Sequence, residues 1–272
     1  MRQDKGRNNM YIDFHTHAFA DNIAQKAVAR LAEVSGFTPY TNGTVADLIR
    51  SLDEDGIDRA VMLPVATKPK QQRVINDISA ELNSYRLICF GSVHPEAEDA
   101  LDELERIKSL GLLGVKFHPD YQDFMVDEER LFPLYEKCAK LGLVMVFHSG
   151  FDPLSPELIH CRPYAAARVS QAFPDGKFVF AHLGGMNLFD EVYEHLAGKP
   201  NVWLDTAFLA GRISDEMLTA VIKKHSAQRV LLASDLPWQK SIDAVAQINS
   251  LDLTDEEREL IFHKSAEMLL GE

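Results

Sequence analysis

The chain has the size of an ordinary globular protein and a strongly acidic charge balance. Its 272 residues are 46% hydrophobic and 25% charged, and they are enough for one large domain such as an α/β barrel. With 28 Lys and Arg against 41 Asp and Glu, the net charge is −13, which argues against affinity for nucleic acid or an anionic membrane. We therefore expect a small-molecule partner, and the sequence leaves open whether the chain forms a homo-oligomer.

The cysteines and the start of the chain indicate a cytoplasmic protein. Cys89, Cys138 and Cys161 are too few and too scattered for a disulfide framework or a zinc knuckle, so we expect reduced thiols. No apolar run reaches membrane-spanning length, and the polar opening at 1–9 is not followed by the apolar core of a signal peptide. Residues 1–9 are expected to be a frayed N-terminus of a single domain that spans residues 1–272.

Eight short apolar, β-branched runs recur along the chain. In chain order they are MYIDFH (10–15), DRAVMLPV (58–65), RLICFGSV (86–93), LLGVKFH (112–118), LVMVFH (143–148), KFVFAH (177–182), NVWLD (201–205) and RVLLASD (229–235). Helical spacing, often closed by Gly, marks segments between them at 44–56, 98–111, 129–142 and 163–176. Eight alternations of strand and helix predict a closed (β/α)8 TIM barrel with a parallel sheet. No Gly-x-Gly-x-x-Gly opens a helix, which argues against a dinucleotide-binding fold.

The first run ends in two histidines that share one face of a strand. His15 and His17 are two residues apart, so their side chains point to the same side. Two imidazoles from one rigid strand can occupy adjacent positions around a zinc ion. A His-x-His also arises by chance, so the hypothesis of a metal site needs further ligands.

Three later runs keep one face apolar until a last polar residue. These last residues are His148 of 143–148, His182 of 177–182 and Asp235 of 229–235. A barrel fills its interior with apolar layers and carries its active site at the carboxyl ends of the strands, so these side chains are expected to converge at one mouth. A helix N-cap is the other interpretation of Asp235.

Four motifs follow one another at the ends of the first, fifth, sixth and eighth strands. They are DFHTH (13–17), FHSG (147–150), AHLGG (181–185) and ASDLPW (233–238), and the chain closes with LTDEERELIFHKSAEMLLGE (253–272). Together they resemble the amidohydrolase superfamily, most closely its branch of single-domain barrels related to aminocarboxymuconate semialdehyde decarboxylase. Ser265 stands where that branch usually has Asn.

The resemblance implies a divalent metal at the mouth of the barrel. It assigns His15, His17, His148 and Asp235 as ligands, with His182 as a further ligand or a residue that faces the substrate. The expected ion is one zinc, with manganese or a second metal as alternatives. Such a site keeps an open position where water is activated, and Asp235 would act there as a general base.

Lys116 and His118 end the fourth run and are expected to point into the barrel. The segment also resembles the fourth strand of dihydroorotase, in which the matching lysine is carbamylated and bridges two metals. In the other interpretation Lys116 is an ammonium that, beside His118, binds a substrate carboxylate or stabilises developing negative charge. A lysine that merely reaches solvent is the alternative without function. Arg162 is a candidate to bind an anionic substrate, or else an exposed loop arginine.

The leading prediction of function is a metal-dependent, amidohydrolase-type hydrolase. It would activate water for attack on an amide, lactone or related carbonyl of a small substrate, anionic if Lys116, His118 and Arg162 bind it, with Asp235, His182 and Lys116 as the catalytic candidates. The alternative is a non-oxidative decarboxylase or hydratase that uses the same metal site on an unsaturated or aromatic carboxylic acid. A third option, a non-catalytic binding barrel, predicts missing ligands at the strand ends, whereas here every expected ligand is present.

Overall fold

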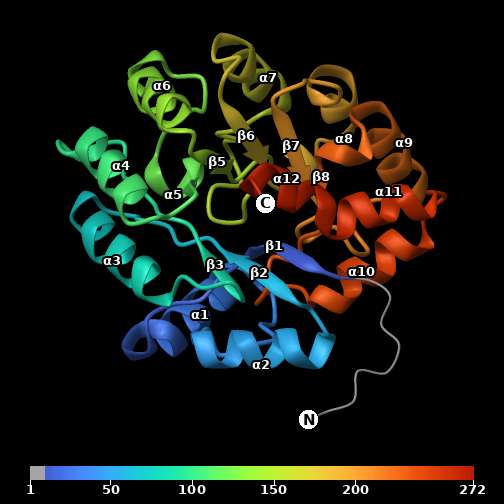
Figure 1. Cartoon of the computed structure of the whole chain (residues 1–272), viewed down its shortest axis with the longest axis horizontal. Coiled ribbons are helices and arrows are strands. Elements are labelled where there is room, and N and C mark those ends of the chain that lie inside the picture. The colour runs from blue at the N-terminus through green and yellow to red at the C-terminus, as the bar shows by residue number, and fades with distance from the viewer. Residues whose placement is uncertain (1–9) are drawn as a thin grey trace.

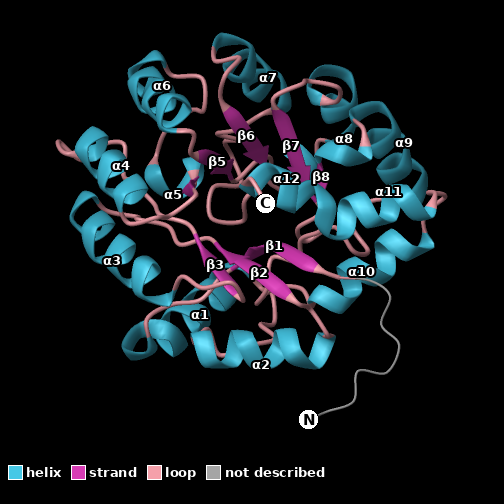
Figure 2. Ribbon diagram, viewed as in Figure 1, coloured by secondary structure: helices cyan, strands magenta, loops and turns pink. Residues whose placement is uncertain are grey.

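Eight parallel strands alternate with helices in the structure, a computed structural model that describes residues 10–272 (Figures 1 and 2). The strands are β1 Ile12–Thr16, β2 Arg59–Met62, β3 Leu87–Cys89, β4 Gly114–Phe117, β5 Val144–Phe147, β6 Lys177–Phe180, β7 Val202–Asp205 and β8 Val230–Leu231. Each strand overlaps one of the eight apolar runs, so the predicted TIM barrel is confirmed. The expectation of a frayed N-terminus at 1–9 lies outside the described residues.

The helices lie around the barrel and connect its strands (Figure 2). They are α1 Asp21–Ser35, α2 Val45–Asp55, α3 Gln72–Leu82, α4 Ala100–Ser109, α5 Pro119–Gln122, α6 Phe132–Leu141, α7 Pro163–Ala172, α8 Phe189–Glu191, α9 Asp215–His225, α10 Ser241–Ser250, α11 Asp255–Glu259 and α12 Ser265–Leu270. The four helices expected between strands are α2, α4, α6 and α7. In residues 10–272 the structure has no helix that is both long enough and apolar enough to cross a membrane.

Local sequence signals set the ends of α2. Thr44 caps its amino end, where the side chain accepts a hydrogen bond from Asp47 N at 3.2 Å. Gly56 ends it in the left-handed conformation, with φ of 71°, which a glycine adopts without steric cost. The same residue type, Gly142, ends α6 with φ of 67°. The helix ends predicted from these two glycines are thus confirmed.

Backbone contacts close the eight strands into a ring. The order is β1-β2-β3 in one group and β4-β5-β6-β7-β8 in the other. Gly91 pairs with Val115 between β3 and β4, and Thr16 pairs with Leu236 between β1 and the end of β8. Since both gaps are bridged, no strand of the ring presents a free edge.

The eighth strand is shorter than its apolar run predicts. Beyond Leu231, side chains take the place of the strand ladder: Ala233 N donates to Thr206 Oγ1 at 2.8 Å, and Ser234 N donates to Asp13 Oδ1 at 3.0 Å. These contacts let the backbone leave the extended conformation, and Asp235 has a φ of 71°. The turn that ends β8 therefore holds the acidic residue of the ASDLPW motif.

A plug of apolar residues from α12 closes the amino end of the barrel. The barrel interior and the plug form one buried cluster: Ile12, Phe14, Val61, Leu63, Ile88, Phe90, Val144, Val146, Val179, Leu231, Ala266, Leu269 and Leu270. Lys177, the first residue of β6, donates to Leu269 O at 3.4 Å, and Figure 1 shows α12 across the centre of the ring. A second, larger core lies between the strands and the surrounding helices. The catalytic candidates inside the barrel therefore lie beyond the apolar layers, toward the carboxyl ends of the strands.

We expect Leu269→Ala to lower the free energy of unfolding by about 2–4 kcal/mol, because it leaves a cavity at the closed end of the barrel. Met268, on the same helix and 53% exposed, is the matched control, and Met268→Ala is expected to change that free energy by less than about 0.5 kcal/mol. Urea denaturation followed by circular dichroism measures both. Equal losses in the two variants would show that α12 does not seal the barrel.

Candidate active site

Three metal-binding atoms converge where β1 and β8 end. His15 Nε2 and His17 Nε2 lie 3.1 Å apart, and Asp235 Oδ1 lies 3.4 Å from the first and 3.1 Å from the second. His15 is 1% exposed and Asp235 is 8% exposed. The structure therefore brings together the two histidines of the first motif and the aspartate of the last, which are more than 200 residues apart in sequence.

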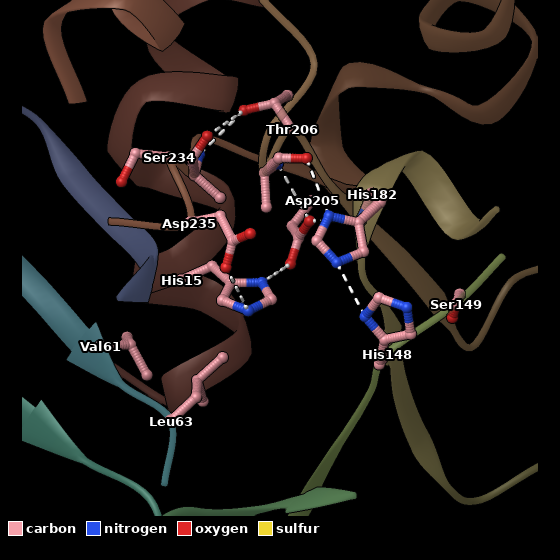
Figure 3. Close-up of polar contacts among 12 residues, drawn as sticks. His15, Val61, Leu63, His148, Ser149, His182, Asp205, Thr206, Ser234 and Asp235 are labelled. Carbon is pink, nitrogen blue, oxygen red and sulfur yellow. Dashed lines mark hydrogen bonds and ion pairs between the residues drawn. The ribbon is translucent and has the colours of Figure 1, made fainter. Parts of the chain in front are cut away.

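The partners of the two histidines determine which nitrogen carries the proton. His15 Nδ1 donates to Asp205 Oδ2 at 2.8 Å, and His17 Nδ1 donates to Leu63 O at 2.9 Å (Figure 3 shows the first bond). Burial, with a smaller contribution from Lys116, holds the pKa of His15 well below its ordinary value, so this ring is neutral. With this tautomer, His15 Nε2 presents its lone pair beside His17 Nε2 and the carboxylate of Asp235. Two imidazole nitrogens and a carboxylate oxygen that converge in this way fit a divalent metal.

Asp205 holds this arrangement and was not among the residues singled out from the sequence. It is fully buried at the end of β7. Besides the bond from His15, its Oδ1 accepts from His182 N at 2.8 Å and from Ala207 N at 3.1 Å. The signal was present, since Asp205 is the last residue of NVWLD just as His148 and His182 end their runs.

Two of the site residues have backbone conformations that non-glycine residues seldom adopt. The φ angle is 71° at Asp235 and 57° at His182. Asp235 N donates to His15 O at 2.9 Å, and the bond to Asp205 holds the backbone of His182. A left-handed residue other than Gly costs about 1 kcal/mol, and such strain is concentrated at functional sites. The motifs after β6 and β8 thus aim their side chains through strained turns.

Lys116 lies beside the same three atoms. It is 1% exposed, and its Nζ lies 3.3 Å from His15 Nε2. Burial lowers its pKa to about 8, against the opposing effects of Asp205 and Asp235. Burial also acts to raise the pKa of Asp235, but the contact with His17 and the nearby histidines outweigh it and hold that pKa below its ordinary value. The site therefore combines an ionised carboxylate with a buried amine.

His148, His182 and His118 form a row on the other side of the mouth. His182 Nε2 lies 3.0 Å from His148 Nδ1 (Figure 3), and the rings of His118 and His148 stack with centroids 4.3 Å apart. His148 Nε2 faces Asp152 Oδ2 at 3.6 Å rather than the atoms of His15 and His17. The structure thus divides the expected ligands between two groups, and Asp152 is a second residue that the sequence reasoning missed.

Close packing of two loops sets the positions of His148 and His182. The FHSG motif meets the residue that follows AHLGG, where Gly150 pairs with Met186. A Cβ at Gly150 would lie 2.0 Å from Met186 N, and the φ of Gly150 is 87°. Only glycine fits there, so the packing of the two loops explains why the FHSG motif ends in glycine.

These groups line a cavity of about 1380 Å³ whose wall includes aromatic rings. The aromatic residues are Phe19, Phe37, Tyr121, Phe151, Phe208 and Trp238.

Arg212 lies at the rim of this cavity, with its guanidinium 3.5 Å from the centroid of the Phe208 ring. Arg162 is not brought to this cavity; it pairs with Glu191 instead. Arg212 had no sequence signal, because it follows β7 in a loop without periodicity.

Comparison with known proteins places the chain in a family. An amidohydrolase family model matches residues 12–271. The chain therefore belongs to the amidohydrolase family, which confirms the resemblance drawn from the four motifs.

One relative and two solved structures show what the chain is similar to. It is 30% identical over 169 residues to 2-amino-3-carboxymuconate-6-semialdehyde decarboxylase of Dictyostelium discoideum, a match that covers 50% of this chain and 47% of the relative. The match thus spans about half the length of that relative.

The solved structures share the fold at low sequence identity. A 5-carboxyvanillate decarboxylase from Novosphingobium aromaticivorans, complexed with manganese and 4-hydroxy-3-methoxy-5-nitrobenzoic acid, has a TM-score of 0.74 at 18% identity, covering 97% of each chain. A 2,6-dihydroxybenzoate decarboxylase complexed with 2,6-dihydroxybenzoate has a TM-score of 0.72 at 16% identity, covering 97% of this chain and all of the other, 100%.

We expect Asp205→Asn to weaken zinc binding by about 10- to 100-fold, because the amide cannot hold the His15 tautomer as a carboxylate does. Competition with a chromogenic chelator measures the affinity. Asp175→Asn, at an exposed aspartate, is the control and should bind zinc as the parent does. Unchanged affinity in Asp205→Asn would mean that His15 is oriented without this hydrogen bond.

Proposed function

We propose that the protein is a metal-dependent, non-oxidative decarboxylase of a small aromatic or unsaturated carboxylic acid. This is the alternative raised from the sequence, and the relatives favour it over the hydrolase because the matched proteins described above are decarboxylases. The observation that carries the proposal is the placement of the amine of Lys116 beside three metal-binding atoms, inside a cavity with aromatic walls. Such a cavity can hold a ring and its carboxylate together.

His15, His17 and Asp235 would hold the divalent ion. Zinc is the ion expected from two imidazoles and a carboxylate, and manganese is an alternative because a solved relative carries it. When bound, the ion supplies a positive charge that orients oxygen atoms of the substrate and withdraws electrons from it. His148 and His182 stand outside this set of three in the geometry above.

The protein's own cations and rings would orient the acid. We assign Lys116 as a free ammonium that binds the carboxylate, and not as a carbamate. Its pKa of about 8 leaves it mostly charged at neutral pH. Trp238, in the wall of the cavity, can pack on an aromatic substrate, and Arg212 at the rim offers a second positive charge to an acidic substituent. His118, stacked on Tyr121 with centroids 3.6 Å apart, lines the same cavity and is the remaining candidate for a substrate contact.

Asp235 is the group positioned to move the proton. Decarboxylation breaks the bond between the ring carbon and the carboxylate, leaves the electron pair on that carbon, and releases neutral CO2. The carbon then needs one proton. An ionised Asp235 can accept the proton of a substrate hydroxyl and deliver it to the carbon, so the carboxylate is restored at the end of each cycle.

We expect the protein to release CO2 from at least one member of a panel of hydroxylated benzoates and unsaturated dicarboxylates, and to leave amides and lactones intact. Gas-phase CO2 detection and product chromatography measure the two reactions. Asp235→Asn should lower the rate of CO2 release by at least about 100-fold while the fold is kept, because an amide does not accept and release a proton as a carboxylate does. Hydrolysis of an amide or lactone, with no CO2 released from any acid, would contradict the decarboxylase proposal and support the hydrolase predicted from the sequence.

Arg212→Met is expected to raise KM for an acid with a second anionic substituent by about 10-fold, with a smaller effect on kcat, because the charge lies at the rim. Arg30 also lines the cavity but is 70% exposed and paired with Glu33, so Arg30→Met is the matched control and should leave KM unchanged. Steady-state kinetics on the active acid decide this. Equal KM values for the Arg212 and Arg30 variants would remove Arg212 from substrate binding.

A further inference from the structure

The cavity of the candidate active site extends away from the metal-binding atoms to the space between α1 and α3. Its volume of about 1380 Å³ exceeds the roughly 300–1,000 Å³ of pockets that hold drug-sized ligands. Figure 1 shows α1, α2 and α3 together on one side of the ring. We call the part of the cavity that α1 and α3 line the apolar arm. Its apolar residues include Ile23, Ala27 and Leu31 of α1 and Ile75, Ile78 and Leu82 of α3.

The helix α3 buries a polar face and turns its apolar face to the cavity. Its buried residues are Gln72, Asn76 and Ser79. Asn76 Oδ1 accepts from Ser92 N at 2.8 Å, and Asn76 Nδ2 donates to Glu103 Oε1 at 2.7 Å. Because these bonds fix the rotation of the helix about its axis, Ile75 and Ile78 line the apolar arm. A helix of a globular protein usually turns its apolar stripe toward the core instead.

The apolar stripe of α3 is incompletely covered by the protein. Val74, which also lines the cavity, is 53% exposed, and Ile75 and Ile78 are half-buried. Leu82 packs against the larger core, whereas Ile75 and Ile78 pack on neither of the two buried clusters. An open apolar wall of this kind is typical of a ligand-binding groove.

The helix α1 supplies the other wall of the apolar arm. Its buried residues, Ala24 and Val28, pack at Gly43, where a Cβ would collide with Val28 and approach Ala24 O to 3.3 Å. With that face used for packing, the next face, from Ile23 to Leu31, lines the arm. Residues four apart in a helix lie on one face, and at about 1.5 Å per residue this stripe is about 12 Å long. The arm thus has the length of a medium alkyl chain.

The charges of the apolar arm disfavour a second carboxylate. Asp21, Arg30 and Glu81 line it and are exposed, and Arg30 pairs with Glu33 at 2.7 Å. The acids outnumber the arginine, and their field repels an anion but not a neutral chain. The buried amine of Lys116 lies at the metal-binding atoms instead. The cavity therefore joins a cationic site for a carboxylate to an apolar arm.

We propose that the substrate acid carries an extended alkyl chain, which lies in the apolar arm between α1 and α3 while the carboxylate lies at Lys116. The inference rests on the proposed function for the position of the carboxylate, and it adds the kind of substituent that the protein selects. An alkyl chain gains affinity in proportion to the apolar area that it removes from water. The cavity suits this occupant because the apolar arm and Lys116 line one continuous space.

The test uses benzoates without a hydroxyl group, because they lack the proton that the proposed reaction moves and so stay intact during a binding measurement. Calorimetry on the purified protein, with zinc chloride present, compares benzoate, para-butylbenzoate and para-octylbenzoate. The octyl acid is expected to bind at least about 10-fold more tightly than benzoate, with the butyl acid between them, since burying one methylene changes affinity by roughly 3- to 4-fold. A wild type that binds the three acids equally would overturn the proposal.

Two alanines of α1 provide a matched pair of variants. Ala27 lines the apolar arm, whereas Ala29 is exposed and does not line the cavity. Ala27→Phe is expected to lower the preference for the octyl acid over benzoate by at least about 5-fold, because the ring takes the space of several methylenes. Ala29→Phe should keep the wild-type preference. Ile78→Gln, on α3, is expected to lower it as well, and circular dichroism checks that each variant is folded. A wild-type preference in both Ala27→Phe and Ile78→Gln would overturn the proposal.

CO2 release from hydroxylated acids tests the proposed function separately, because the binding measurement requires no turnover. A chain-length preference without CO2 release from any acid would support the apolar arm and contradict the decarboxylase, whereas CO2 release with equal affinities for the three benzoates would do the reverse. Sedimentation of a dimer, together with equal affinities, would assign the apolar arm to a contact between two copies of the chain and would also overturn the proposal.

Discussion

The hydrogen bond from His15 to Asp205 is the interaction on which the rest of the site depends. It joins the first strand to the seventh, and it forces His15 to present a lone pair to His17 and Asp235. The second oxygen of the same carboxylate holds the backbone of His182 in its left-handed turn. One buried acid thus determines a tautomer, a ring orientation and a backbone conformation on three neighbouring strands.

The barrel fold gathers the polar groups of this site at one end, where the strands have their carboxyl ends. Its interior is apolar from the plug of α12 upward, so the charged groups of the candidate site lie beyond the last apolar layer. At that end the polar groups of the site pair with one another by hydrogen bonds, and those that face the same point can bind a cation. The low sequence identity to the solved relatives, 16–18%, shows the shared fold, and on a fold that hosts many reactions only the site residues can indicate the chemistry.

The two groups of donors differ in what surrounds them. The group at His15 opens on a cavity with the amine of Lys116 and aromatic walls, which suits a bound acid. The group at His118 packs between stacked rings and two buried carboxylates. Both groups line the same cavity, so the polar atoms of the second group face the substrate pocket as those of the first do.

The sequence by itself determined the barrel, because hydrophobic periodicity is a local property. The eight apolar runs, the two glycines that end helices and the polar residues that close six of the runs can all be read without a structure. It also singled out His15, His17 and Asp235. Only the tertiary structure decided that β8 ends early and that Asp205 and Asp152 lie among the site residues. It also decided that His148 Nε2 faces Asp152 rather than His15. Finally, it showed that Arg162 pairs with Glu191, whereas Arg212 lines the cavity. The physical reason is that periodicity says which face a side chain occupies, whereas tautomer and partner depend on loops that meet only when the ring closes.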